Sequence, residues 1–238
     1  MEQKRLIRFY MAELSTRDDL SSVRSDAVCL YHTAELNIGH AGGLMPYGNA
    51  NEIVKKMSAS LDLDCLRVPV YAGVCGADPI CLMRPLLREL KAQGVTGVQN
   101  FPSVGMADQI FRCNLEAVHL GCRREAEMLM TAKDEELDIF PFVYSLSDAV
   151  ALASAAPRRM IYDLGFDLSP QSPKNGTAFW LERIRAMRSF LDDALPGVEL
   201  YLFVRNQSLK TLIRADPRTP GLIAGFYESF RLEGKEGE

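Results

Sequence analysis

Three polar side chains in one part of the chain are the first candidates for chemistry. Asp78 lies in the segment GVCGADP, directly after an apolar run. Its carboxylate could act as a general base or anchor a metal ion, or it could simply cap a helix whose first position is Pro79. Gln99 and Asn100 interrupt a second apolar segment, and one of the two must point into the protein, where an amide needs a partner. These amides are therefore candidate ligand-binding groups.

Further candidates follow other apolar segments, and each has a structural alternative. His32 could shuttle protons near neutral pH, or it could be a hydrogen-bonded structural histidine. Asp163 with Asp167 could bind a divalent cation through water, although two such aspartates are also common on a solvated turn. Cys75 ends an apolar segment, where a buried structural thiol is favoured over a reactive one.

Arg205 and Asn206 follow a later apolar segment, ELYLFV. The guanidinium group offers a two-point match to a phosphate or a carboxylate. A surface ion pair is the alternative. The sequence therefore indicates a candidate anion-binding site at this position.

All of these candidates lie at the ends of short β-type segments. Eight such segments alternate with helical ones, at residues 4–12, 27–32, 68–75, 97–101, 139–144, 159–165, 199–204 and 222–226. Alternation of strands and helices predicts a parallel sheet, and eight repeats predict a single α/β domain, a (β/α)8 TIM barrel. Because a barrel builds its active site at the carboxyl ends of its strands, the candidates would meet at one rim. An open doubly wound sheet is the rival, but the first turn lacks a GxGxxG fingerprint.

Local signals predict where helices begin and end. Asn49, with Glu52 three residues later, predicts a capping box, and Ser145 predicts another helix start. Asp78 would begin the helix that Gly94 ends. Further helices are expected at 106–115, 123–137, 177–195 and 208–215. Residues 168–176 have no periodicity and predict an exposed loop that could close as a lid, and the tail from about 232 is polar.

Composition bounds the function class. The 238 residues are 47% hydrophobic and 24% charged, which is ordinary for one globular domain spanning 1–238. The net charge of −4 gives no basic field for nucleic acid, and no apolar run is long enough for a membrane helix. The N-terminus lacks a signal peptide, and the six scattered cysteines form no CxxC pair. A cytoplasmic protein with reduced thiols is expected.

Three sequence blocks, AGVCGADP, GVQNFPSVG and GGLMPYGNANEIV, resemble the phosphoenolpyruvate-hydrolase-like TIM-barrel family. That family is related in architecture to the phosphoenolpyruvate mutase and isocitrate lyase barrels. The resemblance is strongest from about residue 42 to residue 142. It implies a barrel enzyme that cleaves, hydrolyses or rearranges a bond next to the carbonyl of a small oxo-acid or related carbonyl compound.

On this resemblance, Asp78 would be the acid or base, the amide pair with His32 would orient or polarise the carbonyl, and Arg205 would hold an anionic group. The expected catalytic residues are Asp78, His32 and Asp163, and the expected substrate-binding residues are Gln99, Asn100, Arg205, Asn206 and Cys75. The wider superfamily allows a divalent metal such as Mg²⁺, although no ligand cluster in the sequence requires one. Barrels of this type commonly associate, so a homo-oligomer is expected.

Four loops depart from the family's glycine-rich patterns and read FYMAELST, YHTAEL, DLGFDLSPQSP and VRNQS. Glycines in such loops let backbone N–H groups approach a phosphate, so their replacement weakens a phosphoenolpyruvate-like assignment. Two hypotheses fit these changes. The site is rebuilt for a different substrate, or the barrel has lost catalysis and serves as a binding or regulatory protein.

Overall fold

A computed structural model describes residues 7–16, 20, 23–35, 49–107, 109–165 and 177–231. Its strands are β1 (Ile7–Leu14), β2 (Ala27–Leu30), β3 (Val70–Gly73), β4 (Gly97–Gln99), β5 (Asp138–Ile139), β6 (Phe142–Val143), β7 (Arg159–Asp163), β8 (Glu199–Phe203) and β9 (Gly225–Arg231). Its helices are α1 (His32–Glu35), α2 (Ala50–Ser60), α3 (Met83–Ala92), α4 (Gln109–Ala117), α5 (Cys122–Asp134), α6 (Leu146–Leu152), α7 (Thr177–Ala194) and α8 (Gln207–Ala215). Short 3-10 helices are η3 (Leu63–Cys65), η4 (Val104–Met106), η5 (Ala153–Ala155) and η6 (Thr219–Gly221). Asp167, the 168–176 loop and the tail from 232 lie outside the described residues.

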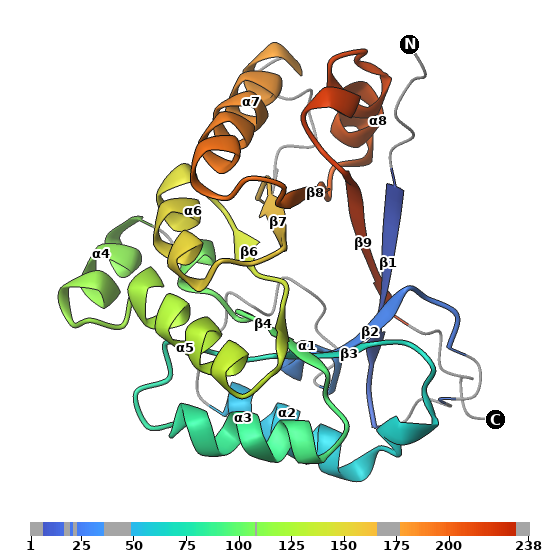
Figure 1. Cartoon of the computed structure of the whole chain (residues 1–238), viewed down its shortest axis with the longest axis vertical. Coiled ribbons are helices and arrows are strands. Elements are labelled where there is room, and N and C mark those ends of the chain that lie inside the picture. The colour runs from blue at the N-terminus through green and yellow to red at the C-terminus, as the bar shows by residue number, and fades with distance from the viewer. Residues whose placement is uncertain are drawn as a thin grey trace.

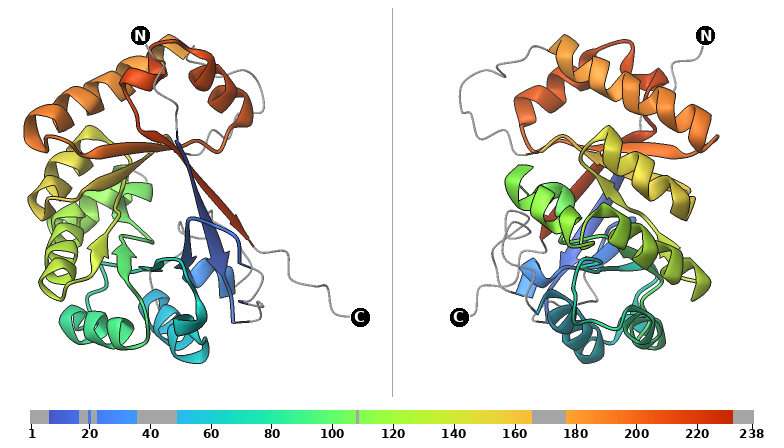
Figure 2. Two further views of the ribbon diagram at one scale, coloured as in Figure 1. Left: turned by 45° about the vertical axis from the view of Figure 1, so that its right-hand side comes forward. Right: turned by 90° about the vertical axis from the view of Figure 1, so that its left-hand side faces the viewer.

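The strands form one parallel sheet that closes on itself. The strand order is β5-β4-β3-β2-β1-β9-β8-β7-β6, and β5 and β6 are joined directly through Phe140 and Pro141. The Phe140 N–H donates to Val98 O (3.1 Å), and the Ile161 N–H donates to Pro141 O (2.8 Å), so this segment bonds to both neighbours. Proline has no N–H to donate, which is why the ladder breaks there. The predicted TIM-barrel fold is confirmed. The sheet has nine strands rather than eight, because the predicted fifth strand is divided at Pro141, and helices cover the outside of the sheet (Figures 1 and 2).

Several predicted boundaries change. Gly94 ends α3 with a positive φ of 95°, and the Ser145 hydroxyl accepts the Asp148 N–H (3.3 Å) at the start of α6, as expected. The capping box predicted at Asn49 is wrong, because this residue takes a left-handed φ of 67° and makes no side-chain capping bond. The helix start predicted at Asp78 is also wrong, since α3 begins five residues later. The last strand begins at Gly225 rather than 222, because η6 and its hydrogen bonds occupy the preceding residues.

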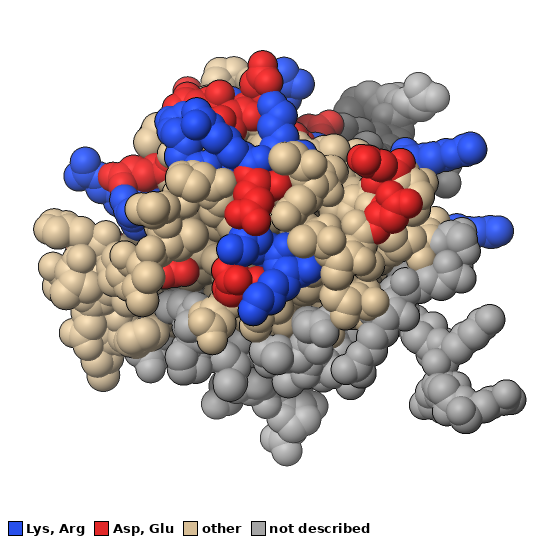
Figure 3. Space-filling model, turned by 90° about the horizontal axis from the view of Figure 1, so that it is seen from below, with Lys and Arg blue, Asp and Glu red and all other residues tan. Residues whose placement is uncertain are grey.

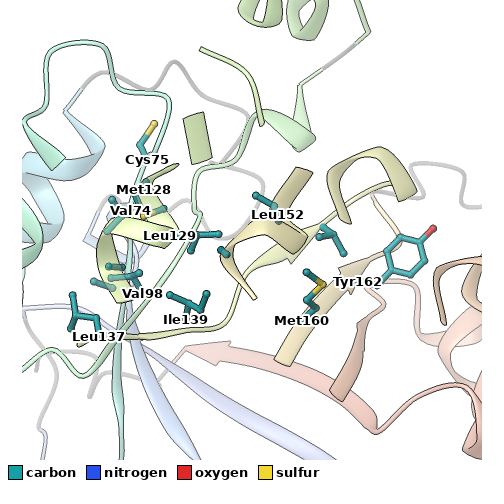
Figure 4. Close-up of a cluster of buried hydrophobic side chains, with 14 of the residues drawn as sticks. Val74, Cys75, Val98, Met128, Leu129, Leu137, Ile139, Leu152, Met160 and Tyr162 are labelled. Carbon is teal, nitrogen blue, oxygen red and sulfur yellow. The ribbon is translucent and has the colours of Figure 1, made fainter. Parts of the chain in front are cut away.

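Two cores hold the barrel. Aromatic rings fill its inside, including Tyr31, Tyr71, Phe101, Phe140, Phe142, Tyr201, Phe203 and Tyr227. The Phe142 and Tyr227 rings pack edge to face with centroids 5.6 Å apart, the arrangement that aromatic quadrupoles favour. Aliphatic side chains fill the second layer, between strands and helices. Figure 4 shows part of it, where Val98 and Ile139 from the strands lie near Leu129 from α5.

Glycine at position 97 is required by the packing inside the barrel. A Cβ atom there would lie 2.6 Å from the Tyr71 ring and 2.9 Å from Asp138 O, and neither neighbour can easily move. We therefore expect Gly97→Ala to lower the free energy of unfolding by about 1–3 kcal/mol in urea denaturation. Gly221→Ala is the matched control, because nothing lies within 4 Å of its added Cβ. Equal midpoints for the two variants would contradict the close contact.

The outer surface mixes both signs of charge. Four described ion pairs connect α3 to the end of α5: Arg84–Asp134 (3.0 Å), Arg84–Glu135, Arg88–Glu135 (2.9 Å) and Lys91–Glu136 (2.8 Å). Blue and red groups alternate on the face in Figure 3, which views the molecule from the side of α2 and α3. Exposed pairs of this kind each contribute little to stability. Within the described parts of the chain, none of the helices is both long enough and apolar enough to span a bilayer.

Candidate functional site

The floor of the barrel mouth is built from two tyrosines and one amide. Tyr31 directly follows β2, Gln99 ends β4 and Tyr227 lies in β9, and all three are fully buried. The Tyr31 hydroxyl donates to Gln99 Oε1 and lies 3.0 Å from the Tyr227 hydroxyl. Burial raises the pKa of both tyrosines well above the ordinary value, so both stay protonated. The floor is therefore a neutral hydrogen-bonded network, and in the structure it leaves Gln99 Nε2 without a partner.

A second orphaned polar atom lies beside this floor. His32 begins α1 and is buried, and none of the described residues forms a hydrogen bond with its Nδ1. Its ring centroid is 5.9 Å from that of Phe101, which in turn packs 4.4 Å from the Tyr31 ring. Burial lowers the pKa of His32 to about 4, so the imidazole is neutral at pH 7. In a neutral imidazole one ring nitrogen donates a hydrogen bond and the other accepts one, and the tautomer decides which nitrogen does which.

An ion pair and a third tyrosine form the opposite side of the mouth. Arg205 follows β8 and donates to both oxygens of Asp163 at the end of β7, at 2.5 and 2.7 Å. Its guanidinium carbon lies 4.5 Å from the centre of the Phe203 ring. The Tyr144 hydroxyl is buried and has no hydrogen-bond partner within the described part of the chain. Its pKa is raised chiefly by burial and then by the Asp163 charge. Because the Tyr144 ring stacks 6.4 Å from Phe142, this group joins the aromatic rings inside the barrel.

The structure places Asp78 and Cys75 on the outer side of the wall. Asp78 Oδ1 accepts the N–H groups of Ile80 (3.0 Å) and Cys81 (3.2 Å), and its Oδ2 accepts from Asn51 Nδ2 (3.1 Å). Asn51 lies on α2, and its Oδ1 also accepts the Cys75 N–H (2.8 Å). Burial raises the pKa of the Cys75 thiol, so it stays protonated. These bonds fix the turn between β3 and α3, and they involve none of the mouth residues.

Asn100 faces outward, away from its neighbour Gln99. Its Oδ1 accepts the Phe142 N–H (2.7 Å), and its Nδ2 donates to Phe142 O (3.1 Å). The side-chain amide thus replaces a backbone strand pair beside Pro141, where the ladder is broken. Glu125 of α5 secures the arrangement, accepting from Asn100 Nδ2 (2.7 Å) and from the Val104 N–H (2.7 Å). The pair of amides predicted to act together is therefore divided between the mouth and the wall.

Asn206 has a local role. Its Oδ1 accepts the Leu209 N–H (2.9 Å) and caps α8. The cap fixes the turn that carries Arg205, so Asn206 supports the candidate anion site through the backbone.

A comparison with known protein families identifies the family of this chain. Residues 23–194 match the phosphoenolpyruvate hydrolase-like family. The chain belongs to this family.

Two relatives are similar to this chain in sequence, and one solved structure is similar to it in fold. Two Solanum lycopersicum proteins, the ToMV susceptible protein tm-1(GCR26) and the ToMV resistance protein Tm-1(GCR237), are 36% and 35% identical over 147 residues. These alignments cover 60% of this chain, which spans only about a fifth of each relative, 20% of its length. The crystal structure of a phosphonopyruvate hydrolase in complex with oxalate and Mg²⁺ superposes with a TM-score of 0.54 at 11% identity. It covers 95% of this chain and 76% of the neighbour, and at this identity it shows the fold alone.

A phosphoenolpyruvate hydrolase-like barrel with a divalent metal would need free oxygen ligands at its mouth. Among the residues described, no group of three His, Cys, Asp or Glu side chains could hold a metal ion. The mouth carboxylates are engaged, since Asp163 pairs with Arg205 and Glu13 accepts from the Ser229 hydroxyl. The described donors at the mouth therefore do not form a metal site.

The site residues predicted from the sequence did not include three tyrosines, Tyr31, Tyr144 and Tyr227. One signal for Tyr31 was available. Gly73 is the last residue of β3, and a Cβ there would lie 2.6 Å from the Tyr31 ring. A glycine inside a strand often marks such a close approach. Nothing in the sequence indicated which partner would approach.

The carboxyl group of Glu125 makes stability depend on pH. Burial raises its pKa from 4.5 to about 7, although three hydrogen-bond donors oppose the shift. The folded protein therefore retains a proton that the unfolded chain releases between these values. We expect the free energy of unfolding to fall as pH rises through this window, by at most about 1.4 kcal/mol per pH unit, and to level off above it.

Glu125→Gln should remove this slope. His32 contributes the opposite slope, because its lowered pKa means that the unfolded chain binds the proton more tightly. The informative quantity is thus the difference between wild type and variant in urea denaturation across pH. Parallel pH curves for the two proteins would contradict the buried proton on Glu125.

Proposed function

We propose that the chain is an enzyme that acts on a small oxo-acid or related carbonyl compound at the carboxyl end of its barrel. It would cleave, hydrolyse or rearrange a bond next to the carbonyl. One observation carries the proposal: among the residues that the structure describes, three buried polar atoms around the same aromatic floor have no hydrogen-bond partner, namely His32 Nδ1, Gln99 Nε2 and Tyr144 Oη. Buried polar atoms are nearly always paired, so three orphans at a barrel mouth are best explained by a polar ligand.

Each group at the mouth has a distinct role in this proposal. The Gln99 amide and the Tyr144 hydroxyl would donate to the carbonyl and carboxylate oxygens, where charge develops during the reaction. The neutral His32 imidazole would transfer the proton. Arg205 would provide the positive charge for the anionic group, and Asp163 would hold the guanidinium in position.

The remaining predicted residues would act through the scaffold. Asn100 would hold the wall, Asn206 would hold the turn of Arg205, and Cys75 would fix the loop after β3. The acid–base role predicted for Asp78 stays a prediction, and the turnover of an Asp78→Asn variant tests it. Because all six cysteines are free thiols, a reducing, cytoplasmic location is the expected one.

Calorimetric titration with oxalate and with small 2-oxo acids, with and without Mg²⁺, tests the proposal. Oxalate is the first probe because it occupies the structurally similar phosphonopyruvate hydrolase. Acids that bind are then incubated with the protein and followed by NMR for turnover. Saturable binding is expected, and Tyr144→Phe should weaken it about tenfold through one lost hydrogen bond. Tyr10→Phe is the control, since the Tyr10 ring is exposed.

A non-catalytic binding barrel is the second candidate. It is favoured by the replaced glycine-rich loops and by relatives described as viral susceptibility and resistance proteins. The same titration separates the two proposals. Absence of uptake for every oxo-acid tested would reject the enzyme and leave the binding role.

A further inference from the structure

The hydroxyl protons of the two floor tyrosines follow one order in the structure. Gln99 Oε1 can only accept a hydrogen bond, so the single proton of the Tyr31 hydroxyl goes to that oxygen. The Tyr227 hydroxyl, 3.0 Å from that of Tyr31, then donates its proton to the Tyr31 oxygen. In the reverse order, neither Gln99 Oε1 nor the Tyr227 proton would have a partner among the described residues. The hydrogen bonds therefore run from Tyr227 through Tyr31 to Gln99.

The Tyr31 ring is tightly packed, which fixes the position of its hydroxyl. A Cβ at Gly73 would lie 2.6 Å from the ring, so the ring fits only because residue 73 has no side chain. The Phe101 ring packs against it with the two centroids 4.4 Å apart. Tyr31 and Phe101 are both fully buried. A group that orients another side chain needs such a rigid setting.

The bond from Tyr31 determines which end of the Gln99 amide is left for a ligand. The oxygen and nitrogen of an amide are nearly alike in shape, so the side chain could present either one to the floor. The Tyr31 proton holds the oxygen there. Nε2 then keeps its protons, and none of the described residues accepts them. An amide turned this way can bond only to an acceptor atom, such as a carbonyl or carboxylate oxygen.

We propose that Tyr31 is a positioning residue that acts through Gln99. Its hydroxyl holds the amide with Nε2 toward the ligand, and the site thereby selects a ligand with an oxygen acceptor at this point. Tyr227 supports Tyr31 by donating to its oxygen. The inference rests on the proposed function, because it takes an oxo-acid as the occupant of the mouth.

A double-mutant cycle, measured by calorimetric titration with oxalate, tests whether Tyr31 acts through Gln99. Tyr31→Phe keeps the ring and removes the hydroxyl, and we expect it to weaken binding about tenfold, because the amide can then turn. In the Gln99→Met background the same change should alter the affinity by less than about twofold, since no amide remains to be oriented. Tyr227→Phe should weaken binding by only about threefold, because Tyr31 keeps its bond to Gln99.

Tyr201→Phe is the matched control. Tyr201 is another buried tyrosine inside the barrel, and its hydroxyl donates to Glu199 (3.3 Å) rather than to the floor, so this variant should bind oxalate as wild type does. Equal effects of Tyr31→Phe in the two backgrounds would overturn the inference and leave the proposed function intact. Absence of binding of every oxo-acid to the wild type would reject the proposed function and this inference with it.

The side-chain amide signals of Gln99 in a proton–nitrogen correlation spectrum give a readout that needs no ligand. Gln99→Met identifies these signals, because they disappear from its spectrum. We expect Tyr31→Phe to shift or broaden them and Tyr201→Phe to leave them in place. Signals that Tyr31→Phe does not change would show that the hydroxyl does not orient the amide, and the inference would be wrong.

Discussion

Replacing Asn100 by leucine will lower the free energy of unfolding by about 3–5 kcal/mol. The side chain makes paired hydrogen bonds to Phe142 N and O and a third to Glu125, all in a fully buried setting. Leucine would leave the Phe142 backbone groups without these two bonds and would remove one of the three donors to the Glu125 carboxyl group, and each unsatisfied buried group costs about 1–3 kcal/mol. The loss also falls where Pro141 already interrupts the strand ladder.

Urea denaturation measures this effect, with Asn206→Leu as the matched substitution. Asn206 accepts the Leu209 N–H and caps α8, and loss of a helix cap costs about 1 kcal/mol. Similar losses for the two variants would show that Asn100 does not bridge the divided strand. If Asn100→Leu does not fold at all, Asn100→Ser in the same titration should still lose more than Asn206→Leu.

Replacing Gln99 by methionine will reduce the affinity for oxalate about 10- to 100-fold while the barrel stays folded. Methionine matches the shape of glutamine but cannot donate the hydrogen bond that the proposed ligand would receive from Nε2. The Tyr31 hydroxyl keeps a partner in Tyr227, which limits the structural cost. For any acid that is turned over, kcat/KM should fall about 100-fold. Unchanged binding and turnover would remove Gln99 from the site.

Asp78→Asn is measured in the same assay, because this substitution distinguishes an acid–base role of Asp78 from a role in forming the turn. Asparagine can still accept the Ile80 and Cys81 N–H groups, but its own amide would meet the donating Asn51 Nδ2. A role limited to the turn predicts a small loss of stability with turnover intact. An acid–base role predicts lost turnover at nearly unchanged stability. The kinetic measurement decides between them.

Local sequence signals succeeded where one short segment is sufficient. Ser145 caps α6 and Gly94 ends α3, because both depend only on the backbone geometry of a few neighbouring residues. The same signals failed at Asp78, where the carboxylate accepts turn N–H groups and bonds to Asn51 on another helix. Gln99 and Asn100 were recognised as unusual polar residues in an apolar strand. Neighbouring residues of a strand point to opposite faces, so one of the two had to face the mouth and the other the wall. Which of them faces the mouth is known only from their hydrogen-bond partners in the structure.

Apolar periodicity and contiguous motifs are local properties, so the alternation of strands and helices, the TIM-barrel fold and the family could be predicted without coordinates. The composition of the site could not, because it depends on contacts between distant segments. Tyr31, Gln99 and Tyr227 meet across as many as 196 positions of the chain, and nothing local records that contact. The pairing of Asp163 with Arg205 and the orphaned Tyr144 hydroxyl likewise arise only when closure brings the strand ends together. The three-dimensional fold determines which polar groups become hydrogen-bond partners, and the sequence shows only which residues could take part.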